Sequence, residues 1–154
     1  MKINVLVNGQ KKIYDVLPDE YLLDTLRADH LYSIKRGCDN SSCGVCTVLF
    51  DGKPVQSCSM LSMKADGHSI TTIEGHQDEA KRLSEHFGHQ GADQCGYCNS
   101  SLALTVHAMK TEIEKPTEED IKEYLVGNLC RCTGYEAQHR AIKLCLEEED
   151  EKWK

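Results

Sequence analysis

The 154-residue chain lacks long apolar runs and has few aromatic residues, which make up 6% of it. No run approaches the roughly 18 consecutive apolar residues of a membrane-spanning helix. Residues 1–7 alternate between polar and apolar side chains, as a short strand does, and contain no apolar centre of a signal peptide. We therefore expect a cytoplasmic protein that has no membrane partner.

Acidic residues outnumber basic ones, 25 to 18, so that the formal net charge is −7 at pH 7. A nucleic-acid partner requires a basic face, so this balance argues against one. The length suits one ordinary domain or two small ones. Two small domains with so few aromatic residues would have thin cores, which bound metal clusters would help to stabilise.

Cysteine, by contrast, is abundant: there are nine, and eight of them fall into two sets of four. The first set has the spacing C-x4-C-x2-C with a lone fourth cysteine, the plant-type ferredoxin pattern for a [2Fe–2S] cluster. The second set combines a C-x2-C pair with a distant C-x-C pair. The first set is Cys38, Cys43, Cys46 and Cys58, and the second is Cys95, Cys98, Cys130 and Cys132.

Three interpretations of these thiols compete. A secreted chain would pair them as disulfides, whereas a cytoplasmic one keeps them reduced and able to bind metal. Structural zinc also accepts four cysteines, but its sites usually use paired C-x2-C knuckles, which the first set does not have. The second set alone is compatible with zinc. We therefore predict iron–sulfur clusters, with a zinc-stapled adaptor protein as an alternative.

The first half of the chain is expected to form a small mixed sheet crossed by one helix. Residues 3–7 and 13–16 alternate on either side of Asn8-Gly9, the strongest short hairpin signal. Leucines from residue 22 to residue 26 have helical spacing, with Asp19 as the expected N-cap. Further strands are expected at residues 47–50, 54–57 and 69–73.

The second half is expected to form four helices after a polar linker at residues 75–80. Thr117-Glu118-Glu119-Asp120 is close to a capping box. The ligand pairs of the second set precede two of the helices, where free N–H groups and the helix dipole favour thiolates. The expected helices cover about residues 80–88, 100–110, 117–127 and 135–149. We predict an α+β fold with domains at residues 1–76 and 77–154.

Three segments around the cysteines are specific enough to indicate a family: Gly37-Cys38 with Cys43-Gly44-Val45-Cys46-Thr47-Val48, Gln94-Cys95-Gly96-Tyr97-Cys98, and Gly127-Asn128-Leu129-Cys130-Arg131-Cys132-Thr133-Gly134-Tyr135. They closely resemble the iron–sulfur subunit of the molybdenum hydroxylases, the xanthine dehydrogenase and aldehyde oxidase family. The resemblance covers nearly the whole chain. It implies a plant-type ferredoxin-like β-grasp domain followed by a four-helix bundle, each holding one [2Fe–2S] cluster.

The resemblance also implies a function and partners. In the family, electrons pass from molybdopterin on a large subunit, through two [2Fe–2S] clusters, to FAD on a third subunit. Gln94 and Cys132 match the positions that approach the pterin, and Cys132 is also an iron ligand. We therefore expect the electron-transfer subunit of a xanthine dehydrogenase-type enzyme, assembled as a dimer of heterotrimers. The active site itself would lie on the molybdenum subunit.

Two alternatives stay open. Enzymes with similar small subunits act on aldehydes, nicotinate, carbon monoxide or aromatic thioesters, and this chain does not contain the pocket that selects among them. A free two-cluster ferredoxin is the other alternative, although Gln94 and the Cys130-Arg131-Cys132 turn favour a docked subunit.

The sequence departs from the family at two places beside the cysteines. Ser41 stands where the family usually has glycine, so we expect strain of about 1 kcal/mol if that residue has a positive φ. Asn99-Ser100-Ser101 replaces the usual Thr-Pro-Gly. We expect altered cluster potentials from both changes. Cys145 is expected to be a buried small hydrophobe, and none of the seven histidines has a metal-pair spacing.

Overall fold

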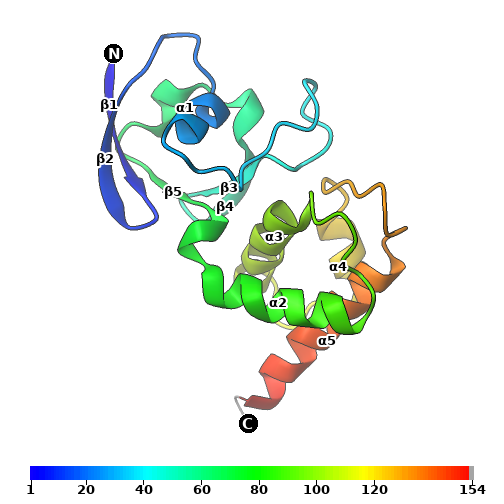
Figure 1. Ribbon diagram of the computed structural model, residues 1–154. Helices are drawn as coiled ribbons and strands as arrows, with labels where there is room; N and C mark the ends of the chain where they lie inside the picture. The colour runs from blue at the N-terminus through cyan, green and yellow to red at the C-terminus, as the bar shows by residue number, and fades with distance from the viewer. Residues whose placement is uncertain (153–154) are drawn as a thin grey trace.

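The computed structural model describes residues 1–152, with side chains described as far as Glu148. A sheet domain at the N-terminal end is followed by a helical region, and the C-terminal helix projects away from the sheet (Figure 1). The predicted α+β class, with a ferredoxin-like domain before a helical one, is confirmed. The last two residues of the predicted second domain, 153–154, lie outside the described residues.

The sheet domain contains five strands in the order β2-β1-β5-β3-β4, with β1 and β5 parallel and the other pairs antiparallel. The predicted hairpin is confirmed, because Asn8 and Gly9 both have a positive φ and join β1 to β2. Ile3, Val5 and Val7 point from β1 into the core. The elements are β1 (Lys2–Val7), β2 (Gln10–Asp15), α1 (Leu22–Ala28), β3 (Thr47–Phe50), β4 (Lys53–Gln56) and β5 (Ser69–Thr71).

The expected N-cap of α1 was wrong. Tyr21, not Asp19, occupies this position, and its side chain makes no capping hydrogen bond. The chain before the helix is instead fixed by Glu20, whose carboxylate accepts bonds from the Leu17 N–H and the Thr25 hydroxyl. A backbone bond from Leu22 N to Met60 O, 2.8 Å long, also engages the first residue of the helix. Tertiary contacts therefore replace the local cap.

Four α-helices follow the sheet within the described residues, as predicted. The polar segment at residues 75–80 is not a linker throughout, because α2 already begins at Gln77. Its first turn carries Asp78 and Glu79, which suit the positive end of the helix dipole. The predicted capping box is confirmed between Thr117 and Asp120. The helices are α2 (Gln77–His89), α3 (Asn99–Glu112), α4 (Glu118–Tyr124) and α5 (Glu136–Lys152).

A small shared core joins the sheet to the helices. Leu49 on β3 packs against Leu104 and Ala108 on α3, and all three are almost fully buried. The helical region has its own core, which includes Phe87, Met109 and Ile142. Cys145 belongs to this core and is 2% exposed, as predicted. No helix in the described part of the chain is long and apolar enough to span a membrane.

Candidate metal centres

The structure brings together the four thiols of the first quartet (Cys38, Cys43, Cys46 and Cys58). Cys38 hydrogen-bonds to Cys43, Cys46 hydrogen-bonds to Cys58, and Cys43 lies close enough to Cys58 for the two to interact electrostatically. All four are free thiols. Four converging thiols are the donor set that a [2Fe–2S] cluster or a zinc ion requires.

The loop between residues 38 and 46 turns its backbone N–H groups towards the sulfurs. Bonds from the backbone of Asn40 and Cys43 lower the pKa of Cys38 to about 6. Burial instead raises the pKa of Cys46 to about 11. The loop therefore stabilises negative charge at Cys38, whereas burial favours the protonated form of Cys46, so that binding of a metal at Cys46 would release a proton.

Ser41 has the positive φ on which the expected strain at this position depended. Its φ is 57°, in the left-handed region that costs a non-glycine residue about 1 kcal/mol or more. Its hydroxyl oxygen lies 3.7 Å from the Cys58 sulfur, within hydrogen-bonding range of a thiolate. The serine therefore adds a polar contact that glycine would not provide.

The second quartet (Cys95, Cys98, Cys130 and Cys132) is assembled from two distant segments. Cys98 is the N-cap residue of α3, and the Cys130–Cys132 turn precedes α5. The Cys98 thiol hydrogen-bonds to the Cys130 sulfur, and the Cys132 thiol hydrogen-bonds to the Cys95 sulfur, with all four thiols free. All four line a cavity of about 500 Å³ together with Tyr97, Leu129 and Arg131. The donor set and the space both fit a cluster.

Two side chains that the sequence did not reveal hydrogen-bond to this quartet. The Thr133 hydroxyl donates to the Cys130 sulfur at 3.1 Å, and the buried Gln138 amide donates to the Cys98 sulfur at 3.7 Å. Burial alone would raise the pKa of Cys130, but the bonds from Thr133 lower it. Burial raises the pKa of Cys98 to about 11.

Hydrogen bonds and close packing join the loops of the two quartets. The Leu129 N–H donates to the Cys43 carbonyl oxygen at 3.0 Å. Gly44, with a φ of 74°, lies so close to Gly127 that an added Cβ would be 2.2 Å from the Gly127 carbonyl oxygen. Tyr97, between Cys95 and Cys98, donates through its hydroxyl to Arg36 O at 3.0 Å. The two quartets therefore occupy one continuous region.

The family departure at residues 99–101 also contributes to this region. The Ser100 hydroxyl donates to the Ser33 carbonyl oxygen at 2.9 Å, which ties α3 to the sheet domain. The Ser101 hydroxyl donates to the Cys98 carbonyl oxygen at 2.9 Å. These serines therefore provide hydrogen bonds that proline and glycine side chains could not.

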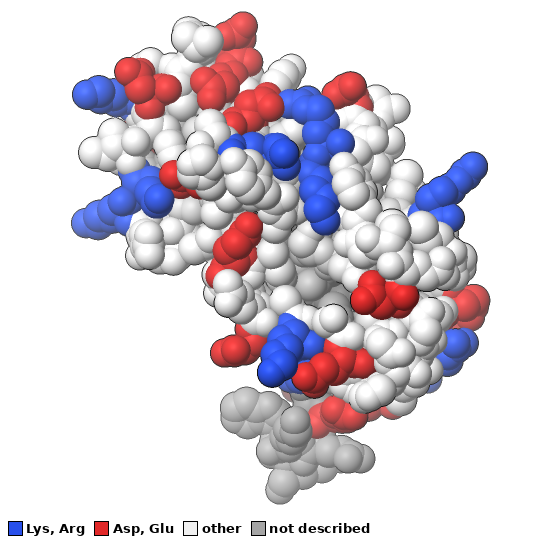
Figure 2. All heavy atoms as spheres, in the orientation of Figure 1, with Lys and Arg blue, Asp and Glu red and all other residues white. Residues whose placement is uncertain are grey.

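One side of the second quartet is exposed. Gln94, Cys95 and Cys132 are all exposed, whereas Cys98 is buried. Leu129 and Tyr97, which line the same cavity, are 47% and 46% exposed. On the face of the molecule shown in Figure 2, charged side chains of both signs are interspersed.

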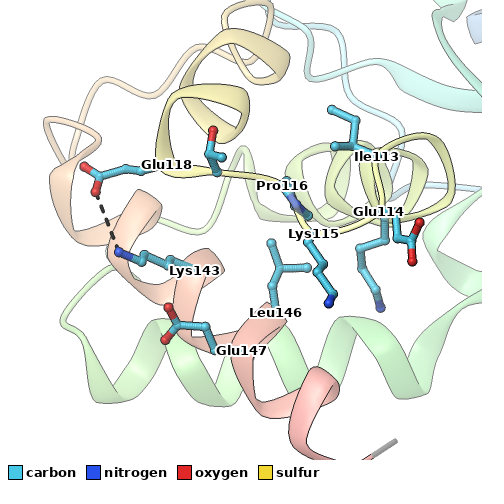
Figure 3. A pocket seen from close by; sticks show the side chains of 10 residues that line it. Ile113, Glu114, Lys115, Pro116, Glu118, Lys143, Leu146 and Glu147 are labelled. Carbon is cyan, nitrogen blue, oxygen red and sulfur yellow. Dashed lines mark ion pairs between the residues drawn. The ribbon is translucent and has the colours of Figure 1, made fainter.

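A second cavity of about 500 Å³ lies away from the thiols, between the end of α3, the loop before α4, and α5 (Figure 3). Lys143 and Glu118 form an ion pair of 3.8 Å across it. Lysine and glutamate side chains both line it, so its lining does not favour a ligand of either charge.

Comparisons with known proteins match both regions. Residues 5–72 match the family described as "2Fe-2S iron-sulfur cluster binding domain", and residues 72–143 match the "[2Fe-2S] binding domain" family. The first match contains the first quartet and the second match contains the second. The fold and the thiols therefore define a protein with two [2Fe–2S]-binding domains.

Proteins of similar sequence and structure show which family within this class the chain belongs to. The chain is 43% identical to the nicotinate dehydrogenase small FeS subunit of Eubacterium barkeri, covering 94% of each chain, and 39% identical to the xanthine dehydrogenase iron-sulfur-binding subunit of Escherichia coli O157:H7, covering 87% of each chain. It superimposes on a chain of quinoline 2-oxidoreductase from Pseudomonas putida 86 with a TM-score of 0.88 and 35% identity, covering 99% of this chain and 96% of that one. This chain belongs to the iron–sulfur subunits of the molybdenum hydroxylases, which transfer electrons.

Proposed function

We propose that each quartet ligates one [2Fe–2S] cluster, and that the chain serves a molybdenum hydroxylase of the xanthine dehydrogenase type. Each cluster, when bound, accepts and releases one electron. The convergence of the two sets of four free thiols in adjoining loops carries this proposal. The first cluster would be held by Cys38, Cys43, Cys46 and Cys58, and the second by Cys95, Cys98, Cys130 and Cys132.

The protein's own groups hold these ligands in place and compensate their charge. Backbone N–H groups of the loop at residues 38–46 stabilise negative charge in the first quartet. Thr133 and Gln138 donate to sulfurs of the second. Hydrogen bonds to ligating sulfurs are among the factors that set the reduction potential of such a cluster. The bond between Leu129 and Cys43 fixes the separation of the two loops.

The exposed side of the second quartet is the proposed contact with the molybdenum subunit. Gln94 and Cys132 would approach the pterin there, and both are exposed. The neighbouring apolar side chains of Leu129 and Tyr97 are partly accessible to a partner as well. FAD would lie on a further subunit of a cytoplasmic dimer of heterotrimers. We place the domain boundary between His76 and Gln77, where α2 begins.

Purification of the native assembly tests this proposal. We expect a molybdenum-containing chain to co-purify and the iron and acid-labile sulfide to match two clusters for each copy of this chain. EPR of the reduced sample should show two distinct [2Fe–2S] signals. A colourless preparation, or one with zinc in place of iron, would refute the ligand assignment. A fully loaded protein without a molybdenum partner would instead support a free ferredoxin.

A nicotinate-oxidising complex is the second candidate, because the Eubacterium barkeri relative is named as part of a nicotinate dehydrogenase. Xanthine, nicotinate and an aldehyde should be offered separately to the native assembly under anaerobic conditions. Bleaching of the visible cluster absorption by xanthine alone would support the first candidate. Bleaching by nicotinate alone would support the second.

A further inference from the structure

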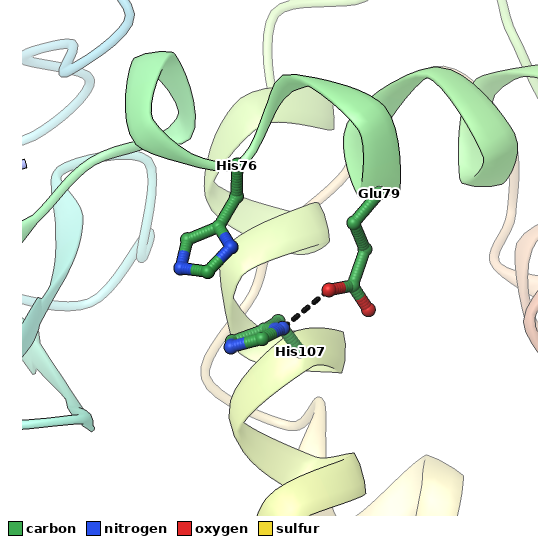
Figure 4. A group of neighbouring side chains, drawn as sticks. All are labelled: His76, Glu79 and His107. Atoms are coloured by element: carbon green, nitrogen blue, oxygen red, sulfur yellow. Dashed lines mark hydrogen bonds and ion pairs between the residues drawn. The ribbon is translucent and has the colours of Figure 1, made fainter.

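Away from the thiols, a second group of metal-binding side chains gathers where the sheet domain meets the helices. His76 immediately precedes α2, Glu79 lies in its first turn, and His107 lies on α3 (Figure 4). One donor atom from each residue can be chosen so that all three lie within 4.8 Å of one another. All three side chains are only partly buried, so an ion from solvent can reach them.

We propose that His76, Glu79 and His107 form a three-ligand site for zinc(II) or a similar divalent transition-metal ion. Two imidazoles and one carboxylate are an established donor set for zinc, with water in the fourth position. Donors around a tetrahedral zinc ion are ~3.3 Å apart, so the gaps between these donor atoms, at most 4.8 Å, would close by no more than about 1.5 Å. Rotations of the side chains of residues on separate elements can provide that movement.

Neighbouring side chains already orient the carboxylate. Lys110 donates to Glu79 Oε1 at 2.6 Å, while Oε2 is turned towards His107 Nδ1, to which it is hydrogen-bonded. Fixing one carboxylate oxygen in this way directs the other towards the ligand position, as outer partners of metal ligands commonly do. A bound ion would replace the bond between Glu79 and His107.

The His76 ring is also placed to contribute. Its centroid is 4.2 Å from that of His107, and no side-chain hydrogen bond of His76 is present within the described residues. Burial lowers the pKa of His76, and the adjacent His107 lowers it further. Burial alone would raise the pKa of Glu79, but bonds from His107 and Lys110 lower it to about 2. Neutral imidazole and ionised carboxylate are the forms that bind metal.

The consequence of binding would be structural. His76 directly follows the 3-10 turn at Ile73–Gly75, which leads out of the sheet domain, whereas His107 lies in the third turn of α3. An ion held between them would cross-link the start of α2 to α3 at the domain junction. Because binding to the native state alone stabilises it, zinc should raise the unfolding temperature.

The test uses the full chain with both clusters in place, so that the eight thiols are occupied, in anaerobic buffer with a controlled concentration of free zinc. Zinc K-edge absorption should show a first shell of nitrogen and oxygen at about 2.0 Å, without sulfur at about 2.3 Å. No bound zinc, or a sulfur shell, overturns the proposal. This measurement does not depend on any variant.

Variants then identify the ligands. Loss of a residue that hydrogen-bonds to a metal ligand typically weakens metal affinity 10–100-fold. Loss of a ligand itself should cost more, so H76A and H107A should each weaken zinc binding by more than about 100-fold, measured in competition with a chromophoric chelator. H68A is the matched control, because His68 pairs with Asp51 at 2.6 Å but belongs to no three-ligand group among the described residues. Visible spectra confirm that each variant retains its clusters. Affinities of H76A and H107A equal to that of H68A would overturn the proposal.

Discussion

The two cysteine quartets have the same donor set of four thiols but are assembled differently. The first is local, since all its thiols come from residues 38–58 of one domain and are surrounded mainly by backbone N–H groups. The second joins the start of α3 to the turn before α5, and side chains of Thr133 and Gln138 support its sulfurs. A local site depends on loop conformation, whereas an assembled site depends on helix packing.

Among the contacts that join the two quartets, Gly44 of the first quartet's loop lies against Gly127, just before the second quartet's turn. This contact, in which neither residue has a side chain, and the hydrogen bond from Leu129 to Cys43 together hold the two loops close to each other. A substitution in the first loop should therefore affect mainly the first centre, and one in the helix packing mainly the second. A substitution at the contact between the loops should affect both centres.

The largest effect is expected from G44A, which disturbs the contact between the loops of the two quartets. An alanine there would adopt a φ of 74° and place its Cβ 2.2 Å from the Gly127 carbonyl oxygen. The conformation costs about 1–2 kcal/mol and the overpacking up to about 3 kcal/mol, so we expect a loss of about 4 kcal/mol in the free energy of unfolding. Denaturant unfolding and iron analysis measure the loss of stability and of both clusters.

Gly52 provides the control, because its φ is 83° but no atom lies within 4 Å of an added Cβ. G52A should lose only the conformational cost of about 1–2 kcal/mol and keep both clusters. Equal losses in the two variants would show that the contact with Gly127 does not matter.

The next largest effect is expected from I142A, which should affect the assembled second quartet more than the local first quartet. Ile142 on α5 is fully buried in the helical core, and its truncation should cost about 3 kcal/mol. Because the second quartet depends on the packing of α5, its EPR signal should be lost on mild warming before that of the first quartet.

Ile70 on β5 is the matched residue in the sheet core, and it is also fully buried. I70A should reduce stability by a similar amount, about 3 kcal/mol, without selective loss of the second signal. If I142A and I70A release the two clusters in the same order, the distinction between a local and an assembled site fails.

The sequence predicted those features that depend on neighbouring residues. The Asn8-Gly9 hairpin and the capping box at Thr117 were predicted and are confirmed, and Ser41 has the positive φ on which its expected strain depended. The Asp19 cap was wrong, because contacts with Met60 and Thr25 hold the start of α1. The linker predicted at residues 75–80 was too long, because Gln77 and the acidic residues after it already belong to a helix.

The missed features depend on packing between distant segments. Gln138 reaches Cys98 only because α5 packs beside the start of α3, and no local spacing reveals this contact. His76 and His107 are likewise brought together by the packing of α2 on α3. The spacing of the thiols indicated which cysteines group together, but not which side chains donate to them.

A smaller effect is expected from T133V, which keeps the shape of the side chain and removes its hydroxyl. A hydrogen bond to a thiolate favours the more negative, reduced cluster, so the potential of the second centre should fall, by about 40 mV if about 1 kcal/mol is lost. A redox titration followed by EPR measures both centres at once. The potential of the first centre should not change.

T111V is the control for this substitution. The Thr111 hydroxyl donates to the Ala108 carbonyl oxygen at 2.7 Å and is not bonded to a sulfur. The T111V substitution should therefore leave the potentials of both centres unchanged. An unchanged second potential in T133V would show that the bond to Cys130 has no influence on the centre.

The smallest effects are expected at Ser41, where two variants separate the backbone from the hydroxyl. S41G should raise the free energy of unfolding by about 0.5–1 kcal/mol, because glycine accepts a φ of 57° at little cost, whereas S41A should not. Both remove the hydroxyl that lies 3.7 Å from Cys58, so both should lower the first potential equally. The shift should be smaller than in T133V, since the contact is longer than the 3.1 Å bond of Thr133. Unequal potentials in S41G and S41A would show that the conformation of the loop, and not the hydroxyl, tunes the first centre.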